Sequence, residues 1–196
     1  MRRSRKEMIA DTRAKLIAAA RQSFGTVGYA ASSMDEFTAA AGLTRGALYH
    51  HFGDKKGLLQ AVVHQIDDEM TVRLDEISAR APTLWQAVVD NWIAYIQMAL
   101  EPEIQRIMFR DAPAVLGDIS LWPDTNGCLM ALTEKLAQLK ADGVLADIDP
   151  EAAARLINGA GIHAATWIAS SDNPEATSKL AVSGFQALLE GLRKGE

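Results

Sequence analysis

The residues whose chemistry is easiest to interpret lie in one short stretch, residues 33–59, which reads SMDEFTAAAGLTRGALYHHFGDKKGLL. Arg45 offers a guanidinium that can donate two parallel hydrogen bonds to guanine or to a phosphate, and Thr44 adds a hydroxyl. Lys55 stands at the start of a helix, where its charge and the free amides can both meet a phosphate. These residue types predict a DNA-contacting surface. Its candidate members in this stretch are Ser33, Thr44, Arg45, Gly46, Tyr49, His50, His51 and Lys55.

Two short helices joined by a tight turn are expected to position these side chains. Ser33 is a good N-cap, and Glu36 three residues later completes a capping box. Gly42 suits the left-handed backbone of a turn, and Thr44 can cap the second helix. Gly46 lacks a side chain where that helix and DNA would approach. The pattern predicts a helix-turn-helix whose second helix enters a major groove by its N-terminal end.

The stretch also resembles the DNA-binding signature of the tetracycline-repressor (TetR) family of bacterial transcriptional regulators. The chain departs from the family pattern at Phe37-Thr38, where Ile-Ala is more usual, so a hydroxyl is expected at a contact between helices. The resemblance implies a C-terminal ligand-responsive domain whose last two helices dimerise. The matching residues are Phe24, Gly28, Tyr29, Ser33, Ala41, Gly42, Thr44, Gly46, Leu48, Tyr49, His51, Phe52 and Lys55.

The charge distribution supports DNA binding although the net charge of the chain is −5. Residues 1–60 hold ten Lys and Arg against five Asp and Glu, a net of +5, whereas residues 61–196 hold ten against twenty, a net of −10. The positive half is the one that would meet a polyanion. We predict two domains, a helix-turn-helix domain over 1–54 and a ligand-binding and dimerisation domain over 55–196.

The basic N-terminus precedes any helical pattern. Arg2, Arg3, Arg5 and Lys6 are expected to form a solvated tail in the free protein. We hypothesise that this arm, through Arg3 and Arg5, orders over phosphates or the adjacent minor groove when DNA is bound.

The rest of the chain predicts an all-α fold of about nine helices, because no long stretch alternates with period two. A three-helix head of roughly 50 residues is marginal as an independent fold, so we expect it to pack on the next helix. The expected helices cover about 11–25, 33–41, 44–52, 55–80, 83–100, 102–117, 129–140, 150–170 and 174–192, with a loop or frayed helix start over 116–126.

The last two helices are the candidates for a homodimer interface, because two helices from each subunit would form a four-helix bundle. The alternative is that both helices are core of the monomer. The candidate interface residues are Gly159, Ala160, Trp167, Ala181, Phe185, Leu188 and Leu192.

Aromatic and Met side chains are frequent in the middle of the chain, where they suit either an adaptable apolar cavity or an ordinary core. Asn158 and His163 are polar on a largely apolar helix and could face a ligand, a partner subunit or the core. The expected ligand is a small apolar or amphipathic molecule. The candidate pocket residues are Ile66, Met70, Trp92, Tyr95, Ile96, Met108, Trp122, Leu132, Asn158, Ile162 and His163.

Other constellations give no support for an enzyme or a cofactor. His64, Asp67 and Asp68 share a helix face, which a solvated surface explains better than a metal site. The single cysteine, Cys128, cannot form an internal disulfide and fits a reducing cytoplasm. No catalytic motif occurs, and no apolar run is long enough to span a membrane.

The sequence therefore predicts a cytoplasmic, homodimeric transcriptional regulator. We expect a repressor that binds a palindromic double-stranded DNA operator and is released by a small effector whose identity the sequence does not give. The alternative is a constitutive DNA-binding dimer whose C-terminal domain binds no effector.

Overall fold

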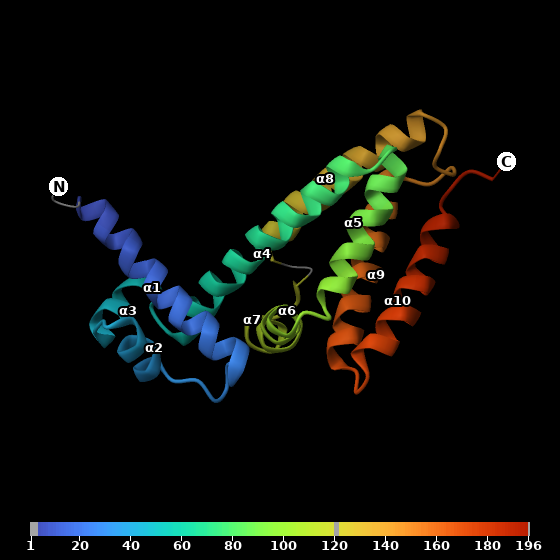
Figure 1. The fold of residues 1–196 in the computed structure, drawn as a ribbon. Coiled ribbons are helices and arrows are strands. Elements are labelled where there is room, and N and C mark those ends of the chain that lie inside the picture. Colours follow the sequence, from blue (N-terminus) through green and yellow to red (C-terminus); the bar gives the residue numbers. More distant parts are fainter. Residues whose placement is uncertain (1–3, 120–121, 196) are drawn as a thin grey trace. The chain divides into compact units, whose positions relative to one another are not determined.

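The computed structural model describes residues 4–119 and 122–195, which are helical almost throughout (Figure 1). An isolated bridge between Leu145 and Arg193 is the only β pairing in these residues, so the predicted all-α fold is confirmed. In chain order the elements are α1 (Arg5–Thr26), α2 (Met34–Ala41), α3 (Arg45–Phe52), α4 (Lys55–Arg80), α5 (Leu84–Met98), α6 (Pro102–Arg106), the π-helical η1 (Ile107–Asp111), α7 (Ala112–Leu116), α8 (Pro123–Ala141), α9 (Pro150–Ser170) and α10 (Pro174–Glu190).

Side-chain caps fix most of the helix starts. The expected caps Ser33, Thr44 and Thr83 accept hydrogen bonds from the backbone three residues on, at 3.1–3.3 Å. Asp149 and Asn173 do the same in front of the prolines that open α9 and α10, at 2.8 and 3.2 Å. These interactions satisfy amides that a helix leaves without a partner in its first turn.

The first helix begins earlier than predicted. Ser4 caps it through a box with Glu7, in which the Ser4 amide donates to Glu7 Oε2 at 2.6 Å. Arg5 and Lys6 consequently lie in the first turn of α1, which corrects the expectation that they belong to an unstructured tail. The Arg2 and Arg3 positions of the proposed arm lie outside the described residues. A second correction concerns α8, which begins at Pro123 within the expected loop.

The chain folds as two compact units. The first holds residues up to Asp68 together with Pro102–Leu116, and the second holds Glu69–Glu101 and Gly117–Glu196. This division differs from the predicted boundary after residue 54, because the first half of α4 and the α6–α7 run belong with the N-terminal helices. None of the helices in the described parts of the chain is long and apolar enough to cross a membrane.

The core of the first unit forms around α1. Phe24 and Phe37 meet edge to face at a centroid distance of 5.3 Å, and Leu16 and Leu48 are completely buried. Leu59 on α4 is also completely buried, as expected if the head leans on this helix. The run Pro102–Leu116 contains one π-helical turn, which precedes Pro113. In this turn the Ala112 amide donates to Ile107 O, five residues earlier, which is the spacing of a π-helix.

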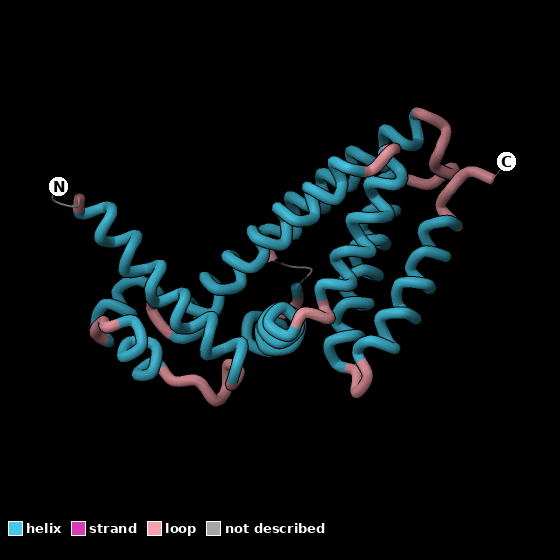
Figure 2. The backbone as a smooth tube through the Cα atoms, in the orientation of Figure 1, coloured by secondary structure: helices cyan, strands magenta, loops and turns pink. Residues whose placement is uncertain are grey.

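The second unit is a bundle of helices in which α9 contacts α5, α8 and α10. Figures 1 and 2 show α9 and α10 as antiparallel neighbours joined by a short loop. Small residues on α9 allow this close packing. Gly161 is the extreme case, because a Cβ at this position would lie 2.4 Å from two ring atoms of Trp92. Trp92 in turn stacks obliquely on Phe185 of α10, with ring centroids 6.1 Å apart.

Candidate nucleic-acid interface

The turn between α2 and α3 has the predicted conformation. Gly42 adopts φ 65° and ψ 34°, a left-handed backbone, and its amide bonds back to Ala39 O at 3.1 Å. Leu43 N bonds to Thr38 O at 2.8 Å, so both amides after α2 are satisfied. The unusual Thr38 is buried, but its hydroxyl donates to backbone oxygens of the preceding turn. The hydroxyl expected at a contact between helices is therefore buried with its hydrogen bond satisfied.

One face of α3, together with its cap Thr44, presents its side chains to solvent. Thr44, Arg45, Gly46 and His50 are exposed, and Tyr49 keeps 53% of its surface exposed. If a Cβ were added at Gly46, its nearest neighbouring atom would be 3.8 Å away, so the chain itself leaves room for a side chain there. The fold itself therefore does not require glycine at this position. A close approach of this surface to DNA would require it.

Arg45 does not extend freely into solvent. Its Nε and Nη2 donate to the two carboxylate oxygens of Asp35, on α2. The hydrogen bond from Arg45 lowers the pKa of the Asp35 carboxyl and raises that of Arg45. Both side chains remain more than 60% exposed, so their pairing is a feature of the outer surface of the helix-turn-helix and not of the core. Asp35 is absent from the residues predicted from sequence, because a carboxylate is not expected beside a DNA-contacting residue.

His51 is half-buried, and Lys55 is turned toward the protein. Arg13 Nη1 donates to the backbone oxygen of His51 at 2.9 Å, and burial lowers the pKa of the half-buried His51 imidazole, helped by the charges of His50 and Arg13. Lys55 Nζ donates to Ser32 O at 2.5 Å and lies 4.4 Å from the centre of the Tyr29 ring.

Burial also lowers the Lys55 pKa. The Lys55 ammonium thus fastens the start of α4 to the loop before α2. Ser33 is occupied as the cap of α2, where its hydroxyl accepts from Glu36 N at 3.2 Å.

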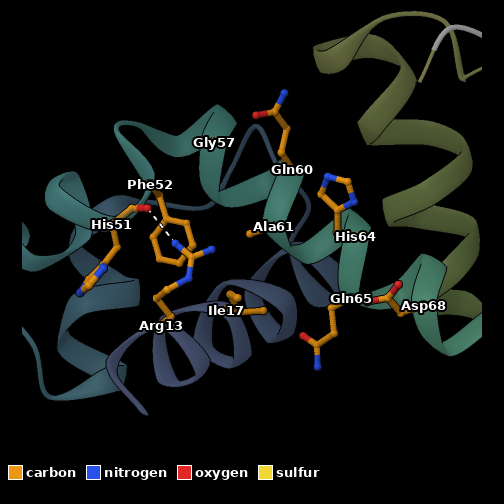
Figure 3. A pocket seen from close by; sticks show the side chains of 10 residues that line it. All are labelled: Arg13, Ile17, His51, Phe52, Gly57, Gln60, Ala61, His64, Gln65 and Asp68. Atoms are coloured by element: carbon orange, nitrogen blue, oxygen red, sulfur yellow. Dashed lines mark hydrogen bonds between the residues drawn. The ribbon is translucent and has the colours of Figure 1, made fainter. Parts of the chain in front are cut away.

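An open hollow of about 480 Å³ lies between α1, α3 and α4 (Figure 3). The guanidinium of Arg13 covers the Phe52 ring at 4.5 Å from its centre, and His64 and Asp68 project from α4. No group of three or more His, Cys, Asp or Glu side chains that could hold a metal ion occurs in the described residues.

One cavity of the second unit, lined by described residues, includes few of the predicted pocket residues. Its volume is about 120 Å³, and only Trp92 and Leu132 belong to both sets. The remaining lining residues are Thr71, Leu74, Asp75, Val88, Asn91, Cys128, Ala131 and Lys135. The lining residues at positions 128, 131, 132 and 135 are spaced so that they share one face of a helix. The sequence prediction chose pocket residues mainly by aromatic and Met type, and it therefore missed most of this face.

The other predicted pocket residues take different places. Trp122 is notable because its Nε1 is buried with no hydrogen-bond partner among the described residues. His163 is exposed on α9, and Asn158, Tyr95 and Ile162 are partly exposed. Those that lie in the core, at 5% exposure or less, are Ile66, Met70, Ile96 and Met108.

The predicted dimer residues divide into two groups. Ala181 and Phe185 are 5% and 3% exposed, so their side chains are buried within the single chain. Trp167 and Leu188 are 47% and 63% exposed. Gly159 is exposed as well, and Ala160 and Leu192 are intermediate. Leu156 and Leu180, which are not among the predicted interface residues, extend the exposed face at 67% and 65%.

A helix-turn-helix with an exposed second helix, joined to a separate helical unit, defines a DNA-binding regulator. Comparison with known proteins agrees. Residues 16–62 match the domain of bacterial regulatory proteins of the tetR family, and residues 85–192 match the tetracyclin repressor-like C-terminal domain. The chain belongs to the TetR family of DNA-binding transcriptional regulators.

Individual relatives show the same relationship. The Transposon Tn10 TetC protein of Escherichia coli is 30% identical over 81% of both chains. A TetR-family regulator of known crystal structure from Pectobacterium atrosepticum is 49% identical, with 98% of this chain and 99% of that chain covered and a TM-score of 0.88. RolR, solved in complex with resorcinol, shares the fold at 21% identity, with 96% and 90% of the two chains covered and a TM-score of 0.67.

Proposed function

We propose that this protein is a homodimeric repressor that binds a palindromic operator and leaves it when a small amphipathic molecule binds the second unit. The observation that carries the proposal is the exposure of Thr44, Arg45, Gly46 and Tyr49 at the start of α3, on a folded head. In a helix-turn-helix this end of the second helix reaches base edges in the major groove.

Homodimerisation is supported by the apolar face that α9 and α10 leave uncovered in one subunit. Leu156 and Trp167 on α9, and Leu180 and Leu188 on α10, are each at least 47% exposed. Isolated exposed apolar residues are common on a monomer, but four large ones on two adjacent helices support a partner surface. A second copy related by a two-fold axis would complete a four-helix bundle and place two heads on successive half-sites.

The effector site is proposed at the cavity between α4, α5 and α8. Trp92 supplies an aromatic wall, while Asp75 and Lys135 supply opposite charges. A ring-bearing molecule with polar substituents would satisfy both kinds of group. The resorcinol bound by RolR is a compound of this type, which supports an analogous ligand class here.

In the proposed mechanism, the effector shifts α4 and thereby the separation of the two α3 helices of the dimer. The effector must bind the DNA-incompetent state more tightly for this to occur. A coupling free energy of ~2–3 kcal/mol would lower operator affinity by roughly a hundredfold.

The rival function is a constitutive DNA-binding dimer, and one observation favours it. The cavity of about 120 Å³ is smaller than the ~300–1,000 Å³ that ligand sites usually occupy, so an effector would have to enlarge it. Thermal unfolding against a library of small amphipathic compounds separates the two functions. A compound that stabilises the protein and releases DNA supports the repressor, whereas the absence of any such compound supports the rival.

Selection of bound DNA from a random pool tests DNA recognition itself. The proposal requires a palindromic motif whose half-sites lie about one helical turn, ~34–36 Å, or a multiple of it apart. Recovery of no motif, or of a single half-site bound by a monomer, would overturn it.

A further inference from the structure

The pair between Asp35 and Arg45 is the feature of the proposed DNA surface that the helix-turn-helix does not explain. Asp35 lies in the first turn of α2, but Ser33 and Glu36 already cap that helix. Exposed ion pairs contribute little to stability. A carboxylate on a surface that meets DNA also repels phosphates. A pair that costs affinity for DNA and adds little stability calls for another role.

The geometry of the pair leaves the base-reading edge of Arg45 available. A guanidinium carries five N–H donors, and Asp35 accepts one from Nε and one from Nη2. Both hydrogens of Nη1 and the second hydrogen of Nη2 remain. One hydrogen of Nη1 and the second hydrogen of Nη2 lie on the end of the guanidinium, the edge that can donate in parallel to O6 and N7 of guanine. Asp35 therefore holds the side of Arg45 and leaves its end unoccupied.

We propose that Asp35 is a positioning residue for base recognition, which orients the Arg45 guanidinium so that its free end reads one guanine in each half-site. The inference rests on the proposed placement of α3 in the major groove. An Arg side chain that is already ordered loses less rotamer freedom on binding. The Asp35 charge also weakens contacts made through phosphates alone, so the pair favours the correct sequence over other DNA.

The experiment uses the full-length protein and the motif selected from a random pool by the wild type. Affinities are measured for the selected site, for every single base-pair substitution and for unrelated DNA. The variants are Arg45→Ala, Asp35→Ala, Asp35→Glu and the double variant Asp35→Ala/Arg45→Ala. Asp11→Ala is the matched control, because it also removes one carboxylate from an exposed ion pair of the first unit, with Lys15 at 2.9 Å. Circular dichroism and thermal unfolding verify that each variant folds.

We expect Arg45→Ala to relax discrimination at one G·C pair by roughly 5- to 150-fold, the range of a bidentate guanine contact. Asp35→Ala should relax the same position by about three- to tenfold and strengthen binding to unrelated DNA. Asp35→Glu, which keeps a carboxylate, should restore part of the discrimination. In the Arg45→Ala background, removal of Asp35 should cause no further change in the discrimination at that base pair. This is the result that a double-mutant cycle gives when one residue acts only through the other. Asp11→Ala should leave discrimination unchanged.

Other outcomes would overturn the inference in distinct ways. Sharper discrimination by Asp35→Ala would mean that the carboxylate withholds Arg45 from DNA. An Asp35 effect that persists without Arg45 would mean that Asp35 itself accepts from a cytosine amino group. Unchanged discrimination would leave Asp35 without a role. If the wild type selects no motif, or if Arg45→Ala leaves the discrimination at every base pair unchanged, then the proposed placement of α3 in the major groove is wrong.

Discussion

Arg21 and Glu103 are 82 positions apart in the chain and are joined by two hydrogen bonds, Nε to Oε1 at 2.8 Å and Nη2 to Oε2 at 2.7 Å. The pair connects α1 to α6. Parallel bonds between guanidinium and carboxylate fix both position and orientation. The α6–α7 run is thereby attached to the helix that organises the head.

Two further contacts reinforce this attachment. Arg106 donates to Thr26 O at 2.7 Å and to Val27 O at 2.8 Å, so it satisfies carbonyl groups at the C-terminal end of α1. Asp111 accepts from the amide of Tyr29 at 2.7 Å. Together the contacts explain why Pro102–Leu116 belongs to the first compact unit although the second unit interrupts the chain before it.

Replacement of Glu103 by Ala should lower the free energy of unfolding by about 1 kcal/mol. Arg21 is only 21% exposed, so its charge would lose a partner in a place where water replaces it incompletely. Urea unfolding measures the change. Glu76→Ala is the control, since it breaks a pair with Arg80 whose side chains are 60% and 76% exposed, and it should cost less than ~0.5 kcal/mol. Equal effects of the two substitutions would contradict the prediction.

Gly28 and Gly42 should differ in their tolerance of alanine. Both have positive φ, at 88° and 65°, so alanine at either position costs about 1 kcal/mol from backbone strain. At Gly42 no atom lies within 4 Å of the added Cβ, whereas at Gly28 it would lie 2.8 Å from Arg106 Nη2. Gly28→Ala must therefore also displace Arg106 from the end of α1.

Gly28→Ala should lower the free energy of unfolding by about 2–3 kcal/mol in total, because the backbone strain and the loss of the hydrogen bonds of Arg106 both contribute. Chemical denaturation of both variants measures the difference. If Gly42→Ala were the more damaging of the two, Arg106 would not be the reason for glycine at position 28.

How much the sequence predicts depends on the range of the interaction. The helix starts at Ser33, Thr44, Asp149 and Asn173 follow from local chemistry, because a cap acts on amides three residues away. Helix α1 is longer than its apolar period predicts, because the polar turns after Ser4 carry no such period. The capping box of Ser4 and Glu7 is the local signal that marks its true start.

Long-range partners are not encoded in such patterns. The Arg21–Glu103 pair and the contact of Arg45 with Asp35 join separate helices, and neither spacing nor composition selects them. Phe185 and Leu188 on α10 illustrate the same limit, because both are apolar and close in sequence. Periodicity does not tell that Phe185 is buried in the core whereas Leu188 is exposed on the surface.

Gly161→Ala should destabilise the second unit by about 1–3 kcal/mol. Its Cβ would meet two atoms of the Trp92 ring at 2.4 Å, and Trp92 also contacts Phe185 and lines the proposed effector cavity. Gly127→Ala on α8 is the matched control, because nothing lies within 4 Å of its Cβ, and it should stabilise its helix by about 0.5–1 kcal/mol. Thermal unfolding and tryptophan fluorescence distinguish the two variants. If both substitutions changed the stability in the same direction, the packing argument would be contradicted.

Acid should destabilise the first unit partly through His51. Burial, with the charges of His50 and Arg13, lowers the pKa of His51, so the folded protein binds fewer protons there than the unfolded chain. The contribution of His51 to stability is therefore complete above the unfolded pKa, about 6.5, and is lost as pH falls through the lower folded value. His51→Asn should reduce the fall in Tm between about pH 7.5 and 5. A fall in Tm over this pH range that His51→Asn leaves unchanged would refute the assignment.

Leu188→Glu should convert the proposed dimer into monomers without unfolding either subunit. The side chain is 63% exposed in one subunit, so a carboxylate there remains hydrated in the monomer but would be buried in a four-helix interface. Sedimentation velocity at micromolar concentration should show at least a roughly tenfold loss of association, with operator affinity falling because the half-sites are then bound separately. Met130→Glu is the control, since Met130 on α8 is equally exposed at 66% and lies outside the α9–α10 face. A wild-type monomer, or equal effects of the two substitutions, would exclude this face as the interface.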